Sequence, residues 1–394
     1  MAEGYAVSAA RGSAAPASLV AALMFVLSLW MSANSNGLAQ LFFLRHEPQR
    51  KVFWLAVTLV AATSSSILGV MLARRRASAA WATVLAIGVA GAIETWLPVA
   101  RSSIEFVALV SASQFALNWA LNATDLAAVS STEDRAAFDR STTVARLLGM
   151  LVAPAVVTLL ASRTGVLRAL FAVLALVALA LGARLARSSS GDRRATTASG
   201  ATNASDRVVL GFAWSVYVSL YLLAANLLYF LRDLAGVRSA ERVGGVTLSV
   251  VFAGALVAAG VRSRLPAWVS GERASMLAPV FMLSATAATL AARVALSLPV
   301  LLVGGALLGA SYGLLLSALR EYVTRGAVEE GRGGLLSAFN NLANASGLTA
   351  FALMSLLASA LRGACLYEGI LGVAGLLPLF GAAALLRYRR RSGT

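Results

Sequence analysis

Two carboxylates inside apolar stretches are the side chains of this chain best placed to do chemistry. Glu94 lies in the apolar stretch 79–98 and Glu105 in the next one, 102–124, and both stretches have about the length that crosses a bilayer. A charge at the centre of such a stretch costs about 2.5–3.5 kcal/mol, so each carboxylate requires a partner or a function. Because they flank the same short loop, the two are candidates for taking up a proton. The alternative is an interfacial pairing with Arg101, which lies between them.

Uncharged amides and tyrosines form a second group of interest inside the apolar stretches. An amide is costly against lipid unless it faces protein or a water-filled cavity. Aromatic rings with a few amides suit a moderately apolar organic molecule better than a small ion, although helix packing would explain the same residues. The predicted cavity residues are Asn34, Asn36, Gln40, Gln114, Asn118, Tyr217, Tyr221, Asn226, Tyr312, Asn340 and Asn344.

Several kinds of catalytic centre lack the residues that they need. The chain has one cysteine, Cys365, and one histidine, His46, which excludes an internal disulfide, a multi-cysteine metal site and a histidine-based triad. No cluster of His, Asp and Glu faces one membrane surface, as an enzyme acting on lipids would require. We therefore expect no enzyme activity, no metal and no cofactor.

The composition requires that these residues be carried on membrane helices. Of the 394 residues 59% are hydrophobic and 13% are charged, too little polar surface for a water-soluble globule. Twelve apolar runs follow one another, so we expect an all-α polytopic membrane protein. The runs are 17–44, 52–73, 79–98, 102–124, 142–162, 166–185, 208–231, 243–261, 274–292, 298–319, 334–360 and 364–386.

A polar stretch in the middle of the chain divides these runs six and six. The residues around 187–206 are mostly Ser, Thr, Gly, Ala and charged residues, which is typical of a flexible linker. We expect a six-helix bundle over 1–186, a cytoplasmic linker over 187–206 and a second six-helix bundle over 207–394. Polar features recur at corresponding places in the two halves, as in an internal duplication.

The distribution of basic residues predicts the orientation. The net charge of +16 comes from residues at the ends of apolar runs and in short loops, which argues for membrane orientation and against nucleic-acid binding. Basic residues are about twice as frequent on the side that holds both termini and the linker. We therefore expect a multi-pass protein of the plasma (cytoplasmic) membrane, with both termini in the cytoplasm.

With this layout the chain resembles the major facilitator superfamily (MFS) over essentially its whole length. The family's G-x-x-x-D-R-x-G-R pattern is partly kept from Gly69 to Arg76, with Ala73 in place of the Asp. In the second half, Ser263-Arg264-Leu265-Pro266 is similar to the family's D-R-L-P version. The resemblance implies two six-helix pseudo-repeats around a cavity lined by the first, fourth, seventh and tenth spans.

The same resemblance directs attention to charges at the cytoplasmic ends of the spans. Pairs that form there would close the inner side and would have to break for inward opening, although exposed pairs contribute only about 0–1 kcal/mol. Arg146, near the start of the fifth span, is expected either to hold an anionic substrate or to neutralise Asp125 or Asp139. The inner-gate candidates are Asp125 with Arg74 or Arg75, and Glu321 with Arg262 or Arg264.

The function expected from these features is secondary active transport. The segment from Gly149 to Pro154 is similar to the G-x-x-x-G-P element of drug/proton antiporters, which favours proton-coupled efflux of a small amphipathic molecule. Alternatives are uptake of a sugar or an organic acid, and a non-transporting protein with this fold. The expected partners are a small-molecule substrate, protons and the lipid bilayer, with the protein as a monomer.

Overall fold

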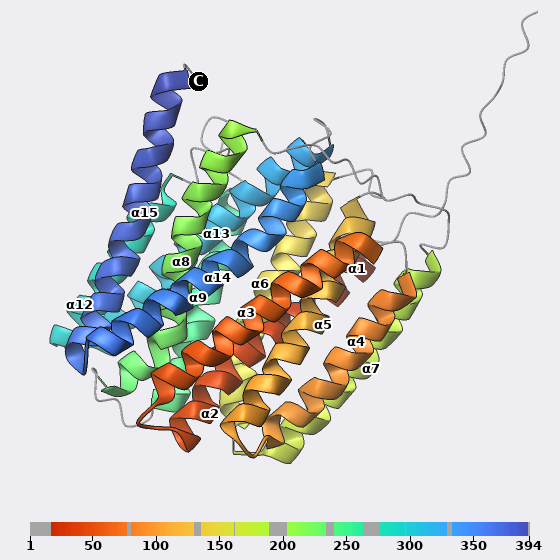
Figure 1. The fold of residues 1–394 in the computed structure, drawn as a ribbon, viewed down its shortest axis with the longest axis horizontal. Helices are drawn as coiled ribbons and strands as arrows, with labels where there is room; N and C mark the ends of the chain where they lie inside the picture. The colour runs from red at the N-terminus through yellow and green to blue at the C-terminus, as the bar shows by residue number, and fades with distance from the viewer. Residues whose placement is uncertain are drawn as a thin grey trace, which may run out of the picture.

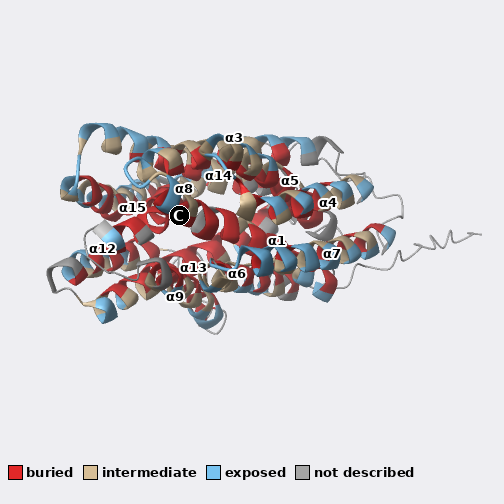
Figure 2. Cartoon of the chain, turned by 90° about the horizontal axis from the view of Figure 1, so that it is seen from below, coloured by how far each residue is buried: buried red, intermediate tan, exposed pale blue. Residues whose placement is uncertain are grey.

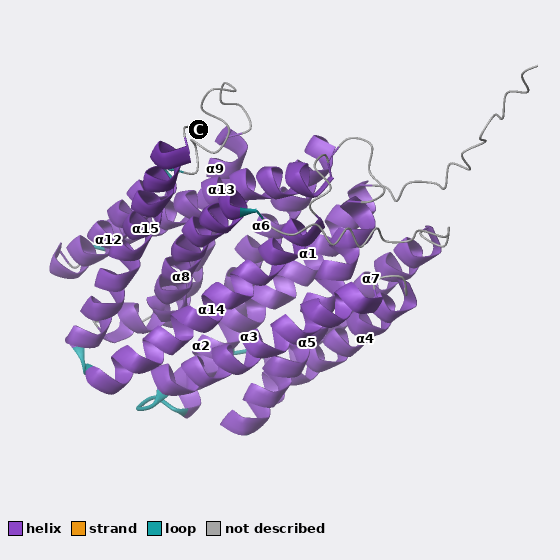
Figure 3. Ribbon diagram, turned by 45° about the horizontal axis from the view of Figure 1, so that its top comes forward, coloured by secondary structure: helices purple, strands orange, loops and turns teal. Residues whose placement is uncertain are grey.

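A computed structural model describes residues 17–76, 80–129, 135–160, 162–188, 203–233, 240–262, 276–295, 297–328 and 333–392. Regular structure within these ranges is helical throughout, and they contain no strand (Figure 3). The helices are α1 (Ala17–Ala33), η1 (Asn34–Leu38), α2 (Ala39–His46), α3 (Lys51–Arg76), α4 (Ala80–Trp96), η2 (Leu97–Val99), α5 (Ser103–Val129), α6 (Arg135–Leu160), α7 (Thr164–Ser188), α8 (Ala204–Asp233), α9 (Ala240–Arg262), α12 (Ala278–Ala295), α13 (Leu298–Val328), α14 (Gly333–Ala360) and α15 (Ala364–Ser392).

The predicted fold class is confirmed. Ten helices in the described ranges are long and apolar enough to cross a bilayer, and shorter apolar helices lie at Ala17–Ala33 and Ala278–Ala292. The first of these continues through η1 into α2, so residues 17–46 form one helical run long enough to span. The chain is an all-α, polytopic membrane protein.

The helices run side by side, and two ends of the bundle can be distinguished (Figure 1). We call the end that holds Ser188 and Ala204 the linker end, which lies at the upper side of Figure 1. The opposite end holds the turn between α2 and α3. Figure 2 shows buried residues on the surfaces between helices and exposed ones on the outer surfaces.

Glycines allow several helices to approach closely. A Cβ on Gly309 of α13 would overlap the carbonyl oxygen of Val251 in α9, and a Cβ on Gly149 of α6 would overlap that of Phe25 in α1. Helix pairs in membranes gain van der Waals contact in this way, without a hydrophobic driving force between them. Gly149 of the antiporter-like element therefore has a packing role in this fold.

The first span is interrupted at its middle by the π-helical turn η1, Asn34–Leu38. A π turn inserts one residue into the α-helical register and is frequent at functional sites. It changes the face on which the residues that follow are presented. Asn34, at the start of the turn, lies deep among α4 and α5, and Gln40, just after the turn, reaches α8.

Two helix pairs join the first half of the chain to the second half: α6 packs on α9, and α3 packs on α14. Polar contacts reinforce this junction. The Ser249 hydroxyl of α9 donates to the Leu151 carbonyl of α6 at 3.0 Å, and the Gln40 amide donates to the Ala224 carbonyl of α8 at 3.1 Å.

At the linker end, α8 begins with a reciprocal cap. The backbone N–H of Asp206 donates to Asn203 Oδ1 at 2.7 Å, and the N–H of Asn203 donates to Asp206 Oδ2 at 3.0 Å. The Tyr322 hydroxyl of α13 adds a bond to Asp206 Oδ1 at 2.6 Å. The predicted linker boundary at 207 is thus three residues later than the start of the helix, and residues 189–202 lie outside the described ranges.

Candidate functional site: a central cavity between the two halves

A cavity of about 110 Å³ lies at the middle of the bundle, with walls from both halves of the chain. Helices α1, α3, α5 and α6 contribute from the first half, and α8, α9, α13 and α14 from the second. None of its lining residues carries a charge. The space therefore suits a neutral molecule better than an ion.

Most hydroxyl groups of the cavity wall use their protons within the protein. Thr63 donates to the Leu59 carbonyl at 2.6 Å and Ser66 to the Ala62 carbonyl at 2.9 Å, both within α3. Ser32 donates to the carbonyl of another lining residue, Met150, at 3.3 Å. These hydroxyls can accept a hydrogen bond from a ligand but have little left to donate.

Two amides supply the donors that the hydroxyls lack. Asn344 of α14 lines the cavity, and its Nδ2 is buried without a hydrogen-bond partner. Gln114 of α5 also lines the cavity and accepts a 3.3 Å bond from Asn118 Nδ2 at its Oε1. One amide from each half can therefore hydrogen-bond a ligand between them.

Aromatic rings cover the side of the cavity formed by the second half. Tyr221 packs edge-on to Phe351 with ring centroids 5.9 Å apart, and both line the space. Tyr312 also lines it and packs against Tyr217 at 5.8 Å. Rings on one side and amides on two sides are suited to a flat organic ring with polar edges.

The structure places the predicted cavity residues in three different surroundings. Gln114, Tyr221, Tyr312 and Asn344 line the cavity. Asn36 and Asn340 have side chains outside the described residues. The remaining ones do not line it, namely Asn34, Gln40, Asn118, Tyr217 and Asn226.

The last group has structural contacts instead. Asn118 supports the wall from behind, because its Nδ2 donates to the Ser66 hydroxyl at 2.9 Å. The Gln40 side-chain amide donates to the Ala224 carbonyl across the junction between the halves. The backbone carbonyl of Gln40 accepts a 3.4 Å bond from the Tyr229 hydroxyl. The Gln40 contacts lie between the cavity and the opposite end.

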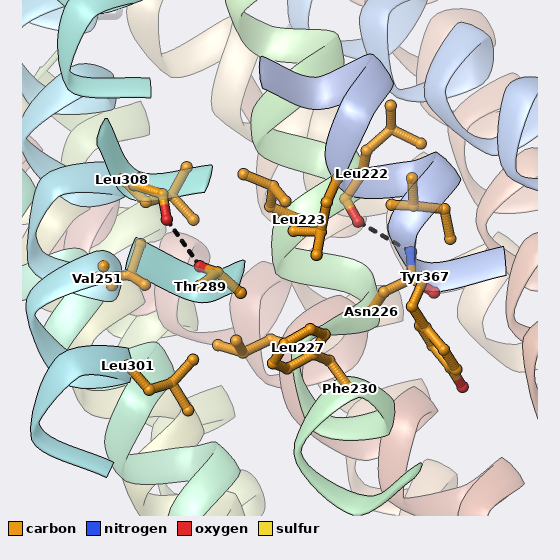
Figure 4. Close-up of a pocket in the computed structure, with 15 residues that line it drawn as sticks. Leu222, Leu223, Asn226, Leu227, Phe230, Val251, Thr289, Leu301, Leu308 and Tyr367 are labelled. Atoms are coloured by element: carbon orange, nitrogen blue, oxygen red, sulfur yellow. Dashed lines mark hydrogen bonds between the residues drawn. The ribbon is translucent and has the colours of Figure 1, made fainter. Parts of the chain in front are cut away.

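Asn226 belongs to a second, smaller pocket of about 30 Å³ that lies within the second half (Figure 4). Its Nδ2 donates to the Leu222 carbonyl at 2.8 Å, and Thr289 donates to the Ala285 carbonyl at 2.8 Å. The other lining side chains shown are almost all apolar, including Leu223. The pocket has room for about one water molecule.

Buried charges lie at the linker end of the bundle, between the cavity and that end. Asp125 of α5 forms ion pairs with Arg146 of α6 and, at 3.2 Å, with Arg320 of α13. The side chains of Asp125 and Arg320 are only 4% and 6% exposed. Since α5 and α6 belong to the first half and α13 to the second, the bond to Arg320 joins the halves.

Of the predicted inner-gate pairs, Arg262 with Glu321 is present, and it lies within one half. Arg262 of α9 contacts Glu321 of α13 at 2.5 Å, and Glu321 also pairs with Arg325 at 3.4 Å. Because both helices belong to the second half, this pair cannot hold the halves together. Of the expected partners, Arg74, Arg75 and Arg264 have side chains outside the described residues.

The two carboxylates Glu94 and Glu105 have different surroundings. Glu94 is completely buried, and its Oε1 accepts bonds from Asn34 Nδ2 at 2.6 Å and from the Ser113 hydroxyl. Glu105 accepts a 2.8 Å bond from the backbone N–H of Arg101 at the start of α5. Glu105 thus lies at the start of α5 beside Arg101, whereas Glu94 is enclosed by other helices.

Sequence reasoning missed part of the site. Thr63 and Ser66 lie in a run of four hydroxyl residues in the second span, a signal that could have marked this helix as part of the cavity wall. Arg320 was not singled out from the sequence, because its partner Asp125 lies in the other half of the chain. Phe351 and Met150 carry no sequence signal, because apolar residues in a membrane helix do not reveal which face they occupy.

The protein is a polytopic helical bundle with a central uncharged cavity between the two halves of the chain. No protein-family profile matches the chain, and no curated protein matches it in sequence.

Solved structures do match it. The chain is similar to the nucleoside transporter NupG, with a TM-score of 0.69 at 11% identity over 94% of this chain and 98% of that one. A second structure, of a mutant of NupG, matches with a TM-score of 0.65 at 12% identity, over 94% and 99% of the two chains. At this level of identity the likeness concerns the fold.

Proposed function

We propose that this protein is a secondary transporter that moves a small, neutral, ring-containing organic molecule through the central cavity. The observation that carries the proposal is a cavity between the two halves that is walled by aromatic rings, hydroxyls and two available amides, with no charged lining residue. In transporters built from two repeats, the substrate site lies at the junction of the repeats near the bilayer midplane.

Uptake is the direction that we favour, and a nucleoside-like nutrient is the substrate class. NupG, which shares the fold, is described as a nucleoside transporter. A flat base with polar edges and a hydroxyl-bearing sugar would match both the rings and the amides of this cavity. The antiporter-like segment that favoured efflux has a packing explanation, since Gly149 permits the contact of α6 with α1.

The transport step would be an alternation of access to the cavity. The ion pair of Asp125 with Arg320 would break when the linker end opens, and the contacts of Gln40 with α8 would break when the opposite end opens. Arg146 stays with Asp125 in either case, because both lie in the first half. We further propose that the halves 1–186 and 207–394 move as units, with the linker end facing the cytoplasm.

Substrate exchange by the purified protein tests this proposal. Liposomes containing the full chain are loaded with unlabelled uridine, adenosine, glucose or lactate, and entry of the same labelled compound is followed. We expect exchange of at least one nucleoside, weaker exchange of glucose and none of lactate. Exchange of lactate alone, or of no compound, would contradict the proposal.

Variants of the two cavity amides connect the activity to the site. A hydrogen bond between uncharged groups contributes about 0.5–1.5 kcal/mol, so Asn344→Ala should raise the KM for exchange two- to tenfold with little change in maximal rate. Gln114→Ala should behave similarly. Asn226→Leu removes an amide from the other pocket and serves as the matched control, with an unchanged KM.

A further inference from the structure

Glu94 lies in a buried polar cluster that the substrate cavity does not include. Its carboxylate comes from α4, its two donors come from η1 and α5, and Asn34 Nδ2 also lies 3.2 Å from Ser113 Oγ. Glu94, Asn34 and Ser113 each have a side chain with no measurable exposure. Both donors serve one oxygen, and the other, Oε2, is buried without a hydrogen-bond partner.

No basic side chain contacts Glu94 among the described residues. Arg168 of the neighbouring α7 bonds the Thr95 carbonyl at 3.1 Å and lies over the Trp96 ring. Arg101 is in the loop that follows α4, and its backbone N–H bonds Glu105. The remaining charges of α5 and α7, Asp125, Arg184 and Arg187, are at the linker end. An ionised Glu94 would therefore be a buried charge that lacks a counter-ion, which is expensive at membrane depth.

The hydrogen-bond donors around the Glu94 carboxylate favour its neutralisation by a proton over neutralisation by a metal cation. A metal cation requires several oxygen ligands around it. Here an amide NH₂ and a hydroxyl proton point at the carboxylate, and such groups repel a cation. A proton needs only one oxygen, and Oε2 is available for it.

Asn34 connects this cluster to the substrate cavity. It is the first residue of the π-helical turn, and Ser32, two residues earlier, lines the cavity and bonds the Met150 carbonyl. Gln40, on the other side of the turn, holds the Ala224 carbonyl in the second half. Protonation at Oε2 leaves Oε1 as the uncharged carbonyl oxygen of an acid, so the bond that Asn34 donates to it loses its charge assistance and weakens. Protonation of Glu94 can thus act on the π-helical turn that lies between Ser32 and Gln40.

We propose that Glu94 is the proton-binding site that drives transport, and that Asn34 and Ser113 are positioning residues that couple its protonation to the first span. One proton binds Oε2 from one side of the membrane, travels as the carboxylic acid and leaves to the other side. This inference rests on the proposed function, because it assigns the ion that moves with the substrate.

Infrared difference spectroscopy on the purified full-length protein tests the proton site without any substrate. Spectra are recorded while the pH is changed, and the C=O stretch of a protonated carboxyl group is followed. We expect a band that appears as the pH falls, that is lost in Glu94→Gln and that remains in Glu105→Gln. Glu105 is the matched control, since it lies at the start of α5 outside the cluster. A spectrum of Glu94→Gln that equals wild type, or a band that sodium ions abolish, would overturn the proton site.

Transport measurements test the coupling. With one proton per substrate, a pH difference of one unit supports an accumulation of uridine or adenosine of up to about tenfold. Glu94→Gln should lose this accumulation while it keeps exchange at equal concentrations, which also shows that the variant is folded. Asn34→Ala and Ser113→Ala should lower the accumulation and keep the exchange. Undiminished accumulation in Glu94→Gln overturns the coupling, whereas absence of exchange in the wild type counts against the proposed function and leaves the infrared result to decide the proton site.

Discussion

Replacement of Asp125 by Asn should open the linker end of the protein. The side chain would keep its size but lose the charge that faces Arg146 and Arg320. Two guanidinium groups, whose side chains are 16% and 6% exposed, would then face each other without a carboxylate. Breaking a buried pair by removal of one partner costs about 3–5 kcal/mol, which lowers the ratio of closed to open molecules by a factor of roughly 100 to 4,000.

The arrangement of the three charges also predicts an order of effects. Arg320→Met removes the ion pair between the halves and leaves Asp125 paired with Arg146, so its effect should be smaller than that of Asp125→Asn. Glu321→Gln should have little effect. The Glu321 side chain is 51% exposed, its partner Arg262 lies in the same half, and an exposed pair contributes only about 0–1 kcal/mol.

Cysteine accessibility measures this opening. Cys365 is exposed, so the parent protein carries Cys365→Ser, and Met150→Cys adds a thiol in the cavity wall. Oriented vesicles are treated with a membrane-impermeant maleimide on the linker side. We expect labelling to be fastest with Asp125→Asn, intermediate with Arg320→Met and close to the parent with Glu321→Gln. Equal labelling rates in the parent and in Asp125→Asn would refute the reasoning.

Two further changes test the packing and the helix cap. Gly309→Val should lower stability by about 1–3 kcal/mol or more, because a side chain there meets the backbone of α9, and the thermal unfolding midpoint in detergent should fall. Gly372→Ala is the control, since a Cβ there meets no atom within 4 Å. Equal midpoints for the two variants would argue against the close approach of α13 and α9. Asp206→Ala should cost about 1–2 kcal/mol, because it removes the carboxylate that accepts the Asn203 N–H in the cap of α8 and the Tyr322 hydroxyl. Tyr322→Phe should cost less in the same unfolding assay because the reciprocal cap survives it, and a larger loss in Tyr322→Phe than in Asp206→Ala would contradict this assignment.

The sequence predicted the spans well because apolar length is a direct physical requirement of the bilayer. It did not predict which face of a helix a polar residue occupies. Asn34 was expected in the cavity but bonds Glu94 instead, and Gln40, which follows the inserted π-helical turn, bonds Ala224. A pattern with a period of 3.6 residues contains no sign of such an insertion.

The charges show the same limit in another form. Asp125 was singled out from its place at the end of a span, and Arg146 was considered for it because both lie near one interface. Arg320 lies far away along the chain, so its contact with Asp125 depends on how the two halves meet. Residue spacing describes one helix or one hairpin, and it carries no information on contacts between distant helices.

The hydroxyls of α3 have a consequence for the unloaded protein. Thr63 and Ser66 donate to carbonyls of their own helix, so these bonds are present whether or not a ligand fills the cavity. A molecule that leaves would uncover the amides of Gln114 and Asn344, which water can satisfy. In the proposed cycle the unloaded form must return before the next turnover. Because these hydroxyls of the wall stay hydrogen-bonded within the protein, the return step stays low in energy. The rate of turnover would then depend on the ion pairs at the linker end and the Gln40 contacts toward the opposite end rather than on the vacated site.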